Sequence, residues 1–291
     1  MIPPPFEYAA PKSLDEAIRL LGQDENAKVL AGGQSLLPLM RFRLASPDLL
    51  VDINHITGLD AVHENGNWLM IGALARESAL DHSDLVHRYY PLLADTTRMV
   101  ADPLVRNLAT LGGNLSHADP ANDHPATMLA YGAQVVARGP KGERTIPIET
   151  FFIGPFESAL AHDEILTEIR IPKHQPGDKG AYIKMERRVG DFATAAVAVQ
   201  LRLDNYGQCT QVGIGLTNVG LTPIKAKAAE EKLKGRQVND TSIREAAQMA
   251  SEAADPQEDN RGSVEYKRAL VKTLTSRALH AAMNRSDGGM Q

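Results

Sequence analysis

The sequence contains a single cysteine, Cys209, among its 291 residues. One thiol forms no internal disulfide, and it cannot hold an iron–sulfur cluster, which typically takes four cysteines. If this chain exchanges electrons with such a cluster, the cluster must therefore belong to another chain. The amino terminus, MIPPPFEYAAPKS, has no basic segment followed by an apolar run. We therefore expect no secretory signal and a cytoplasmic location.

Long apolar runs and an excess of positive charge are also missing. Because the sequence has no stretch of about 18 apolar residues, we expect no integral membrane segment. The formal net charge is -5 and no basic stripe runs through the chain, so its electrostatics do not support binding to nucleic acid. Hydrophobic residues make up 43% of the chain, and a chain of this length is expected to form about two domains.

Three motifs of nucleotide-binding and hydrolytic proteins are absent as well. Gly213 and Gly215 begin a Gly-x-Gly-x-x-Gly pattern, but Asn218 stands where the third glycine belongs. The sequence has no Gly-x-x-x-x-Gly-Lys-Ser/Thr phosphate loop. Ser35 lacks the final glycine of a nucleophile elbow, which argues against a hydrolase nucleophile at that position.

Two similar Gly-Gly segments are present instead. The first begins at the end of a predicted strand at 28–31 and consists of Leu30, Ala31, Gly32, Gly33, Gln34, Ser35 and Leu36. The second consists of Thr110, Leu111, Gly112, Gly113 and Asn114. Glycine lets a ligand approach the backbone closely, and consecutive N–H groups in such a turn form a concave anion site. One Gly-Gly pair is more often an ordinary turn, but two pairs with hydroxyl and amide neighbours favour a dinucleotide held from two sides.

The polar segment 174–180, rich in glycine and proline, is the best candidate linker. Before it, Ser13 and Glu16 predict a capped helix, and 74–100 is expected to be mostly helical with a break near Pro91. Strands before the linker are predicted at 49–53, 68–71 and 165–171, with a hairpin at 134–148. Beyond the linker, strands are predicted at 181–187, 194–203 and 210–217, and helices at 226–234, 241–253 and 264–284. Strands followed by helices favour an α+β arrangement.

Four longer segments carry a more specific signal. They are AGGQSLLPLMRFRL at 31–44, RNLATLGGNLSHADPANDHPA at 106–126, YIKMERRVGDFATAAVAV at 182–199 and GIGLTNVGLTP at 213–223. In this combination and order they resemble the FAD-binding medium subunit of carbon-monoxide-dehydrogenase-type molybdenum hydroxylases, a module that is also fused within xanthine dehydrogenases. The resemblance covers nearly the whole chain.

The resemblance implies an α+β fold with a vanillyl-alcohol-oxidase-type (PCMH-type) FAD-binding domain at 1–176, divided into subdomains at about 1–57 and 58–176. It implies a C-terminal domain at 177–291 with a three-stranded antiparallel sheet and a helical layer. The implied function is electron transfer from [2Fe-2S] clusters of a partner through FAD to an external acceptor. The implied partners are a large molybdopterin-containing subunit, which selects the substrate, and a small [2Fe-2S] subunit, in a dimer of heterotrimers. The alternatives are a self-contained small FAD-dependent oxidoreductase and a non-enzymatic dinucleotide-binding module.

The resemblance also assigns residues. Both Gly-Gly segments would grip the FAD pyrophosphate, and Asp123 would contact FAD. Leu166 and Lys184 would lie beside the flavin or its ribityl chain. Phe192 would lie near the flavin ring, where relatives often carry an aromatic side chain with a polar group; phenylalanine can stack there but cannot form a hydrogen bond. No catalytic acid or base is expected in this chain.

The residues alone leave alternatives open for two of these positions. Asp123 also fits the cap of a helix that starts at His124, and Lys184 also fits a strand residue with its ammonium in solvent. His117, Asp119, Asp123 and His124 are residue types that bind metals, but they lack a recognised ligand spacing, so we expect no metal.

Overall fold

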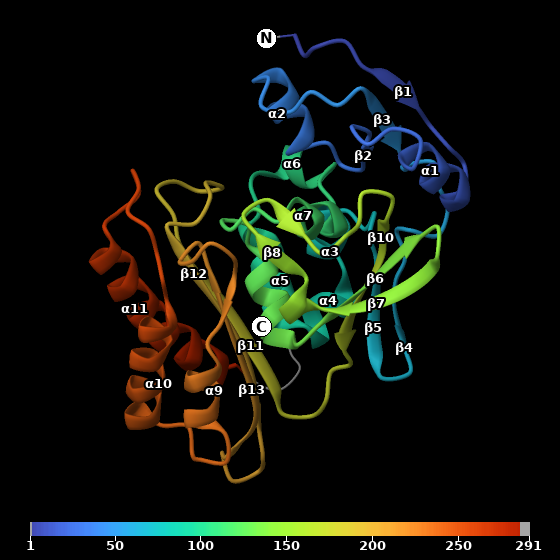
Figure 1. The fold of residues 1–291 in the computed structure, drawn as a ribbon. Coiled ribbons are helices and arrows are strands. Elements are labelled where there is room, and N and C mark those ends of the chain that lie inside the picture. The colour runs from blue at the N-terminus through green and yellow to red at the C-terminus, as the bar shows by residue number, and fades with distance from the viewer. Residues whose placement is uncertain (1, 286–291) are drawn as a thin grey trace.

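The computed structural model describes residues 2–285. Three units follow one another along the chain, and each is built around its own β-sheet (Figure 1). The N-terminal unit lies at the top of the view, the second unit lies beneath it, and the C-terminal unit flanks the second.

The N-terminal unit is a parallel three-stranded sheet with strand order β1-β3-β2. Its elements are β1 (Glu7–Ala9), α1 (Leu14–Leu21), β2 (Lys28–Leu30), α2 (Leu36–Arg41) and β3 (Leu49–Asp52). The predicted start of α1 is confirmed, because the Ser13 side chain accepts a hydrogen bond from the Glu16 backbone N–H at 3.2 Å. This helix buries Ala17, Ile18 and Leu21 against the sheet. The apolar stretch 36–40 belongs to a short helix, α2.

The second unit is a five-stranded antiparallel sheet covered by short helices, with strand order β4-β5-β10-β6-β7. Its strands are β4 (Val62–Asn65), β5 (Trp68–Gly72), β6 (Gln134–Gly139), β7 (Gly142–Pro147) and β10 (Ile165–Pro172). Its helices are α3 (Glu77–Asp81), α4 (Asp84–Tyr89), α5 (Pro91–Met99), α6 (Pro103–Arg106), α7 (Leu111–His117) and α8 (His124–Tyr131). A 3-10 turn (Ile148–Thr150) and the small strands β8 (Phe152–Gly154) and β9 (Glu157–Ser158) complete it. The predicted hairpin is confirmed, and Pro91 begins α5 at the expected break.

The C-terminal unit confirms the predicted antiparallel sheet with a helical layer and adds one element. Its strands, in spatial order, are β11 (Asp178–Met185), β12 (Ala195–Leu203), β13 (Cys209–Thr217) and β14 (Ile224–Lys225). Its helices are α9 (Lys227–Leu233), α10 (Asp240–Ala253) and α11 (Val264–Met283). Three long strands were expected, and the two-residue β14 extends the sheet by pairing with β13.

Both faces of the C-terminal sheet are buried. Val197 and Ile214 pack in the same cluster as Leu274 of α11. On the opposite face, Tyr182 and Ala198 join the core of the second unit. Helix α8 therefore lies directly on the sheet, so the second and C-terminal units share one hydrophobic core. Among the residues that the structure describes, no helix combines the length and apolar character needed to cross a bilayer.

Candidate functional site

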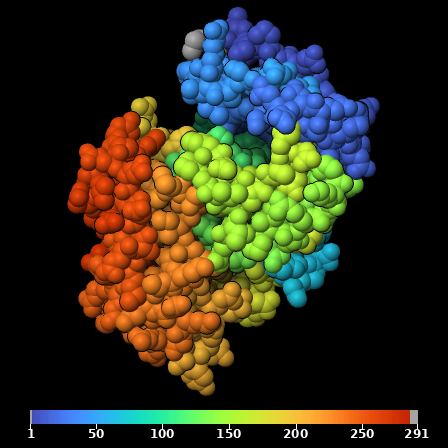
Figure 2. Space-filling model, viewed as in Figure 1, coloured from blue at the N-terminus to red at the C-terminus, as the bar shows by residue number. Residues whose placement is uncertain are grey.

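A cavity of about 590 Å³ opens between the N-terminal unit and the two units beneath it. Figure 2 shows the hollow below the N-terminal unit, which is coloured blue. Its walls come from the turn after β2, the start of α7, the segment before β10, and the loop between β11 and β12. Distant parts of the sequence thus meet at one site.

Most residues that the sequence singled out line this cavity. The lining includes Leu30, Ala31, Gly32, Gly33, Gln34, Ser35, Leu36, Thr110, Gly112, Gly113, Asn114, Asp123, Leu166 and Phe192. Leu111 and Lys184 do not line it. Leu111 is fully buried in the core of the second unit, and its N–H donates to Ala75 O at 3.1 Å, so it presents neither group to the cavity.

The first Gly-Gly segment is an open turn between β2 and α2. Gly33 has φ +73°, a left-handed conformation that favours glycine. A Cβ on Gly32 would lie 2.3 Å from Leu108 O, so glycine is required there by contact with the residues just before the second Gly-Gly segment. Within the described chain, the backbone N–H groups of Gly33, Gln34 and Ser35 have no hydrogen-bond acceptor. These three donors are therefore available to an anion.

The second Gly-Gly segment differs from the expected loop, because it forms the first turn of α7. Thr110 caps this helix by accepting from the Gly113 N–H at 3.1 Å. The Gly112 N–H donates to Ala73 O, and the Asn114 N–H donates to Thr110 O. Since these N–H groups are occupied, this segment does not repeat the backbone anion site of the first. Its contribution is made by side chains, and the buried Oδ1 of Asn114 has no partner in the described residues.

Asp123 lies at the floor of the cavity and is nearly inaccessible to solvent. Its carboxylate accepts from the Tyr182 hydroxyl at 2.6 Å and from Lys184 Nζ at 3.0 Å. Asp123 occupies the N-cap position of α8, as the capping interpretation predicts, but its side chain makes no cap hydrogen bond to this helix. Burial raises the pKa of this carboxyl above its ordinary value, and the Lys184 charge opposes that rise.

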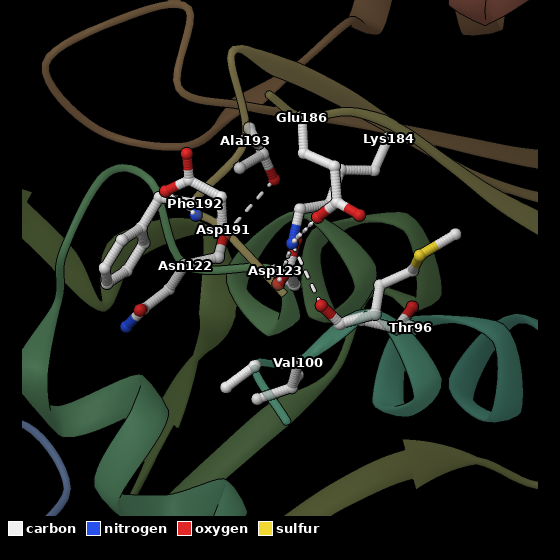
Figure 3. A network of polar contacts seen from close by, with 12 residues as sticks. Thr96, Val100, Asn122, Asp123, Lys184, Glu186, Asp191, Phe192 and Ala193 are labelled. Atoms are coloured by element: carbon white, nitrogen blue, oxygen red, sulfur yellow. Dashed lines mark hydrogen bonds and ion pairs between the residues drawn. The ribbon is translucent and has the colours of Figure 1, made fainter. Parts of the chain in front are cut away.

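Lys184 does not have its ammonium in solvent, since only 1% of its side chain is exposed. Besides Asp123, its Nζ contacts Met99 O at 2.9 Å and Glu186 Oε2 at 3.2 Å (Figure 3). Because Lys184 is absent from the cavity lining, it reaches the cavity only through Asp123. This geometry makes Lys184 a support for the carboxylate rather than a group exposed in the cavity.

Phe192 lies on the loop segment 186–193 between β11 and β12, where it lines the cavity, and 47% of its surface is exposed. Arg261 donates to Phe192 O at 2.7 Å and to Asp191 Oδ1 at 3.2 Å. Arg187 donates to Asp191 Oδ2 at 3.1 Å. These two arginines and the Phe192 N–H hold the pKa of Asp191 at about 2 although partial burial opposes the shift. The loop is therefore fastened to the segment that precedes α11.

Sequence reasoning missed several lining residues. The cavity also includes Val100, Ala101, Leu160, Ala161, His162 and Glu164. The last four lie in a turn that carries no motif, so no sequence signal marks them. Ala101 has φ +44°, which the sequence does not reveal. Asp191 belongs to the same segment as Phe192 and was open to prediction from it.

The four residues considered for a metal site do not converge. His117 Nε2 lies 4.0 Å from Asp119 Oδ2, whereas His124 Nε2 is 2.7 Å from Glu77 Oε2. In residues 2–285, no group of three potential metal-binding side chains is found. The first Gly-Gly turn and the unpartnered amide of Asn114 instead suit an elongated anionic ligand with polar groups, and FAD fits that description.

Comparison with known proteins gives a consistent assignment. Residues 4–174 match the FAD-binding domain in molybdopterin dehydrogenase, and residues 180–282 match the CO dehydrogenase flavoprotein C-terminal domain. The chain is 43% identical to the carbon monoxide dehydrogenase medium chain of Hydrogenophaga pseudoflava, covering 98% of this chain and 99% of that one. It is 35% identical to the 6-hydroxypseudooxynicotine dehydrogenase complex subunit alpha of Paenarthrobacter nicotinovorans, covering 98% and 97%.

A solved structure agrees. Carbon monoxide dehydrogenase from Hydrogenophaga pseudoflava, lacking the Mo-pyranopterin moiety of its cofactor, superimposes with a TM-score of 0.95 at 45% identity, over 97% of this chain and 99% of that chain. The matches span both halves of the chain and all three sheets. The chain therefore belongs to the family of FAD-binding medium subunits of carbon-monoxide-dehydrogenase-type molybdenum hydroxylases.

Proposed function

We propose that this chain is an electron-transfer subunit that binds FAD. Electrons would pass from [2Fe-2S] clusters on a small partner subunit, through this FAD, to an external acceptor. A large molybdopterin-containing subunit would complete the protomer, and two protomers would pair as a dimer of heterotrimers. The proposal includes the domain division 1–176 and 177–291, the subdomains 1–57 and 58–176, and a cytoplasmic location.

The observation that carries the proposal is that both Gly-Gly segments, Asp123 and Phe192 line the same cavity. The free N–H groups of Gly33 and its neighbours would bind the pyrophosphate, and Asn114 would bind a polar group beside it. When bound, FAD supplies a redox centre that exchanges electrons singly or in pairs, while the protein supplies binding and orientation.

The acids of the cavity favour electron transfer over the alternative of a self-contained oxidoreductase. A substrate-transforming flavoenzyme needs a free acid or base beside the flavin. Asp123 is held by Tyr182 and Lys184, Asp191 is held by two arginines, and Glu164 is held by Arg144. These three carboxylates therefore serve as fixed anchors and are poorly suited to proton transfer with a substrate.

We further propose that the large partner subunit determines which substrate the complex oxidises. The relative at 43% identity is named for carbon monoxide, and the relative at 35% identity is named for an organic compound. Since both cover nearly the whole chain, the medium subunit serves complexes with very different substrates.

The test is purification of the full chain, alone and co-expressed with its partner subunits. Alone, the protein should bind one FAD and bleach with dithionite, but it should not turn over carbon monoxide, aldehydes or N-heterocycles. In the complex, one of these substrates should reduce the FAD. If the protein stays colourless after FAD is added, the proposal is wrong. If the isolated chain turns over one of these substrates, the self-contained oxidoreductase is favoured instead.

A further inference from the structure

Two consecutive residues at the start of α3, Arg76 and Glu77, form hydrogen bonds with residues that adjoin the two Gly-Gly segments and Asp123, although neither lines the cavity. Arg76 donates to Asn54 Oδ1 at 2.6 Å and also to Leu108 O. Asn54 in turn donates to Ala31 O at 2.9 Å. A hydrogen-bonded chain therefore connects the first Gly-Gly segment to the residues that lead into the second.

Glu77 extends in the other direction. Its backbone N–H donates to Ala109 O at 2.9 Å, immediately before the Thr110 cap of α7. Its carboxylate Oε2 lies 2.7 Å from His124 Nε2. His124 directly follows Asp123, so Glu77 joins the second Gly-Gly segment to the carboxylate at the cavity floor.

The Glu77–His124 contact is unusual for a purely stabilising pair. Both side chains are fully buried. Glu77 Oε1 and His124 Nδ1 have no further partner in the described part of the chain. Burying two such groups costs free energy that one hydrogen bond offsets only in part. An apolar pair of similar volume would be at least as stable, so stability alone does not explain this one.

We propose that Arg76 and Glu77 are positioning residues that together set the separation between the first Gly-Gly segment, the second Gly-Gly segment and Asp123. This inference rests on the proposed function, because it takes FAD as the ligand of the cavity. A dinucleotide contacts all three regions at once, so its affinity depends on their spacing. Neither residue needs to touch the ligand for this role.

The test is titration of the FAD-free full chain with FAD, following flavin fluorescence to obtain both Kd and stoichiometry. The variants are Arg76→Met, Asn54→Ala and Glu77→Gln. We expect each to raise the Kd by at least about tenfold, equivalent to about 1.4 kcal/mol, with close to one site per folded chain. Arg76→Lys, which retains the charge but not the two-pronged geometry, should recover part of the loss.

The matched control is Thr96→Val. Thr96 and Thr127 form a buried 2.6 Å hydroxyl contact between α5 and α8, one helical turn beyond His124, and neither lines the cavity. This variant should lower the unfolding midpoint without changing the Kd. If Arg76 and Glu77 had only a structural role, their variants would behave like this control: the unfolding midpoint or the fraction of folded chains would fall, and the Kd of the folded chains for FAD would be unchanged.

The outcomes separate the two proposals. If wild-type protein binds no FAD, the proposed function fails. If wild-type protein binds FAD and the variants bind it with unchanged Kd, only the positioning role is overturned. Arg76 and Asn54 are half-buried, so their variants decide the question even if Glu77→Gln does not fold.

Discussion

The Lys184–Asp123 ion pair gives the clearest prediction at the residue scale. A carboxyl whose pKa is higher in the folded chain stabilises the fold most below its ordinary pKa, and loses that stabilisation as pH rises. Burial raises the pKa of Asp123, and Lys184 limits the rise. Lys184→Met should therefore destabilise the protein by about 3–5 kcal/mol at pH 8 and by clearly less at pH 5. Urea unfolding at both pH values measures the difference.

Lys227→Met is the control for this prediction. The Lys227 ammonium pairs with Glu149 at 2.7 Å, but 67% of its side chain is exposed. Solvent screens such a pair, so its removal should give no difference between pH 5 and pH 8. An equal loss at both pH values in Lys184→Met would contradict the pKa argument.

Gly32 provides a second test at this scale. A Cβ at this position would lie 2.3 Å from Leu108 O, so Gly32→Ala must push the two Gly-Gly regions apart. We expect at least about a tenfold rise in the Kd for FAD, measured by fluorescence titration. Gly22→Ala is the control, because its nearest neighbour would be 3.5 Å away and its φ is -70°. Unchanged affinity in Gly32→Ala would show that the contact relaxes at no cost to the site.

Residue patterns identify the walls of the cavity but not what holds them. The Gly-Gly segments and Asp123 stand out because their composition is unusual. Arg76 and Glu77 look like ordinary charged residues at the start of a helix, so nothing in the sequence indicates their contacts. Those contacts depend on chain segments up to 47 residues apart, as between Glu77 and His124. The tertiary fold determines which of these distant residues meet, and local patterns in a single sequence do not reveal such contacts.

At the scale of elements, apolar runs were the most predictable features. The long strands β10, β12 and β13 lie where alternating or continuous apolar residues predicted them. The strands β1 and β4 were missed, because β4 reads Val-His-Glu-Asn and has no apolar pattern. Helix α7 was missed because glycine disfavours helices, yet Gly112 packs against Ala73 where no Cβ fits. Packing overrides local preference in that helix.

The loop 186–193 provides the prediction for an element. Arg261 fastens it to the C-terminal unit through Asp191 and Phe192. Because the pKa of Asp191 is about 2, this carboxylate stays charged at every pH near neutrality. Arg261→Met should therefore release the loop and speed hydrogen–deuterium exchange of its amides, and iodide should quench the fluorescence of bound FAD more strongly.

Arg268→Met is a suitable control for the loop. The Arg268 side chain donates to Ala254 O and lies 4.0 Å from Asp255, and within residues 2–285 no hydrogen bond or ion pair joins it to the loop. Its exchange pattern at 186–193 should match that of the wild type. If Arg261→Met also exchanges like the wild type, Arg261 is not what fastens the loop.

At the scale of the whole molecule, the division between FAD-binding and C-terminal units is not a division of the core. One face of the C-terminal sheet packs on α8, and α8 carries Asp123 at its start. The contact is close, because a Cβ on Gly213 would lie 1.8 Å from Ala130 O and one on Gly215 would lie 2.0 Å from Ala126 O. The glycines that suggested a broken nucleotide motif thus have a packing function.

This close packing predicts that the two units unfold together and that Gly215→Ala uncouples them. In the wild type, the single Trp68, which lies in β5, should report the same urea midpoint as far-ultraviolet circular dichroism. In Gly215→Ala, the added methyl displaces α8, which should cost about 1–3 kcal/mol and separate the two midpoints. FAD affinity should fall as well, because Asp123 moves with α8.

Ile214→Val is the control, because Ile214 lies on the other face of the same strand. This variant should lose about 0.5–1.5 kcal/mol of stability, with coincident midpoints. Coincident midpoints in Gly215→Ala would mean that the joint core tolerates the displacement, and an unchanged Kd for FAD would mean that the position of Asp123 does not depend on it.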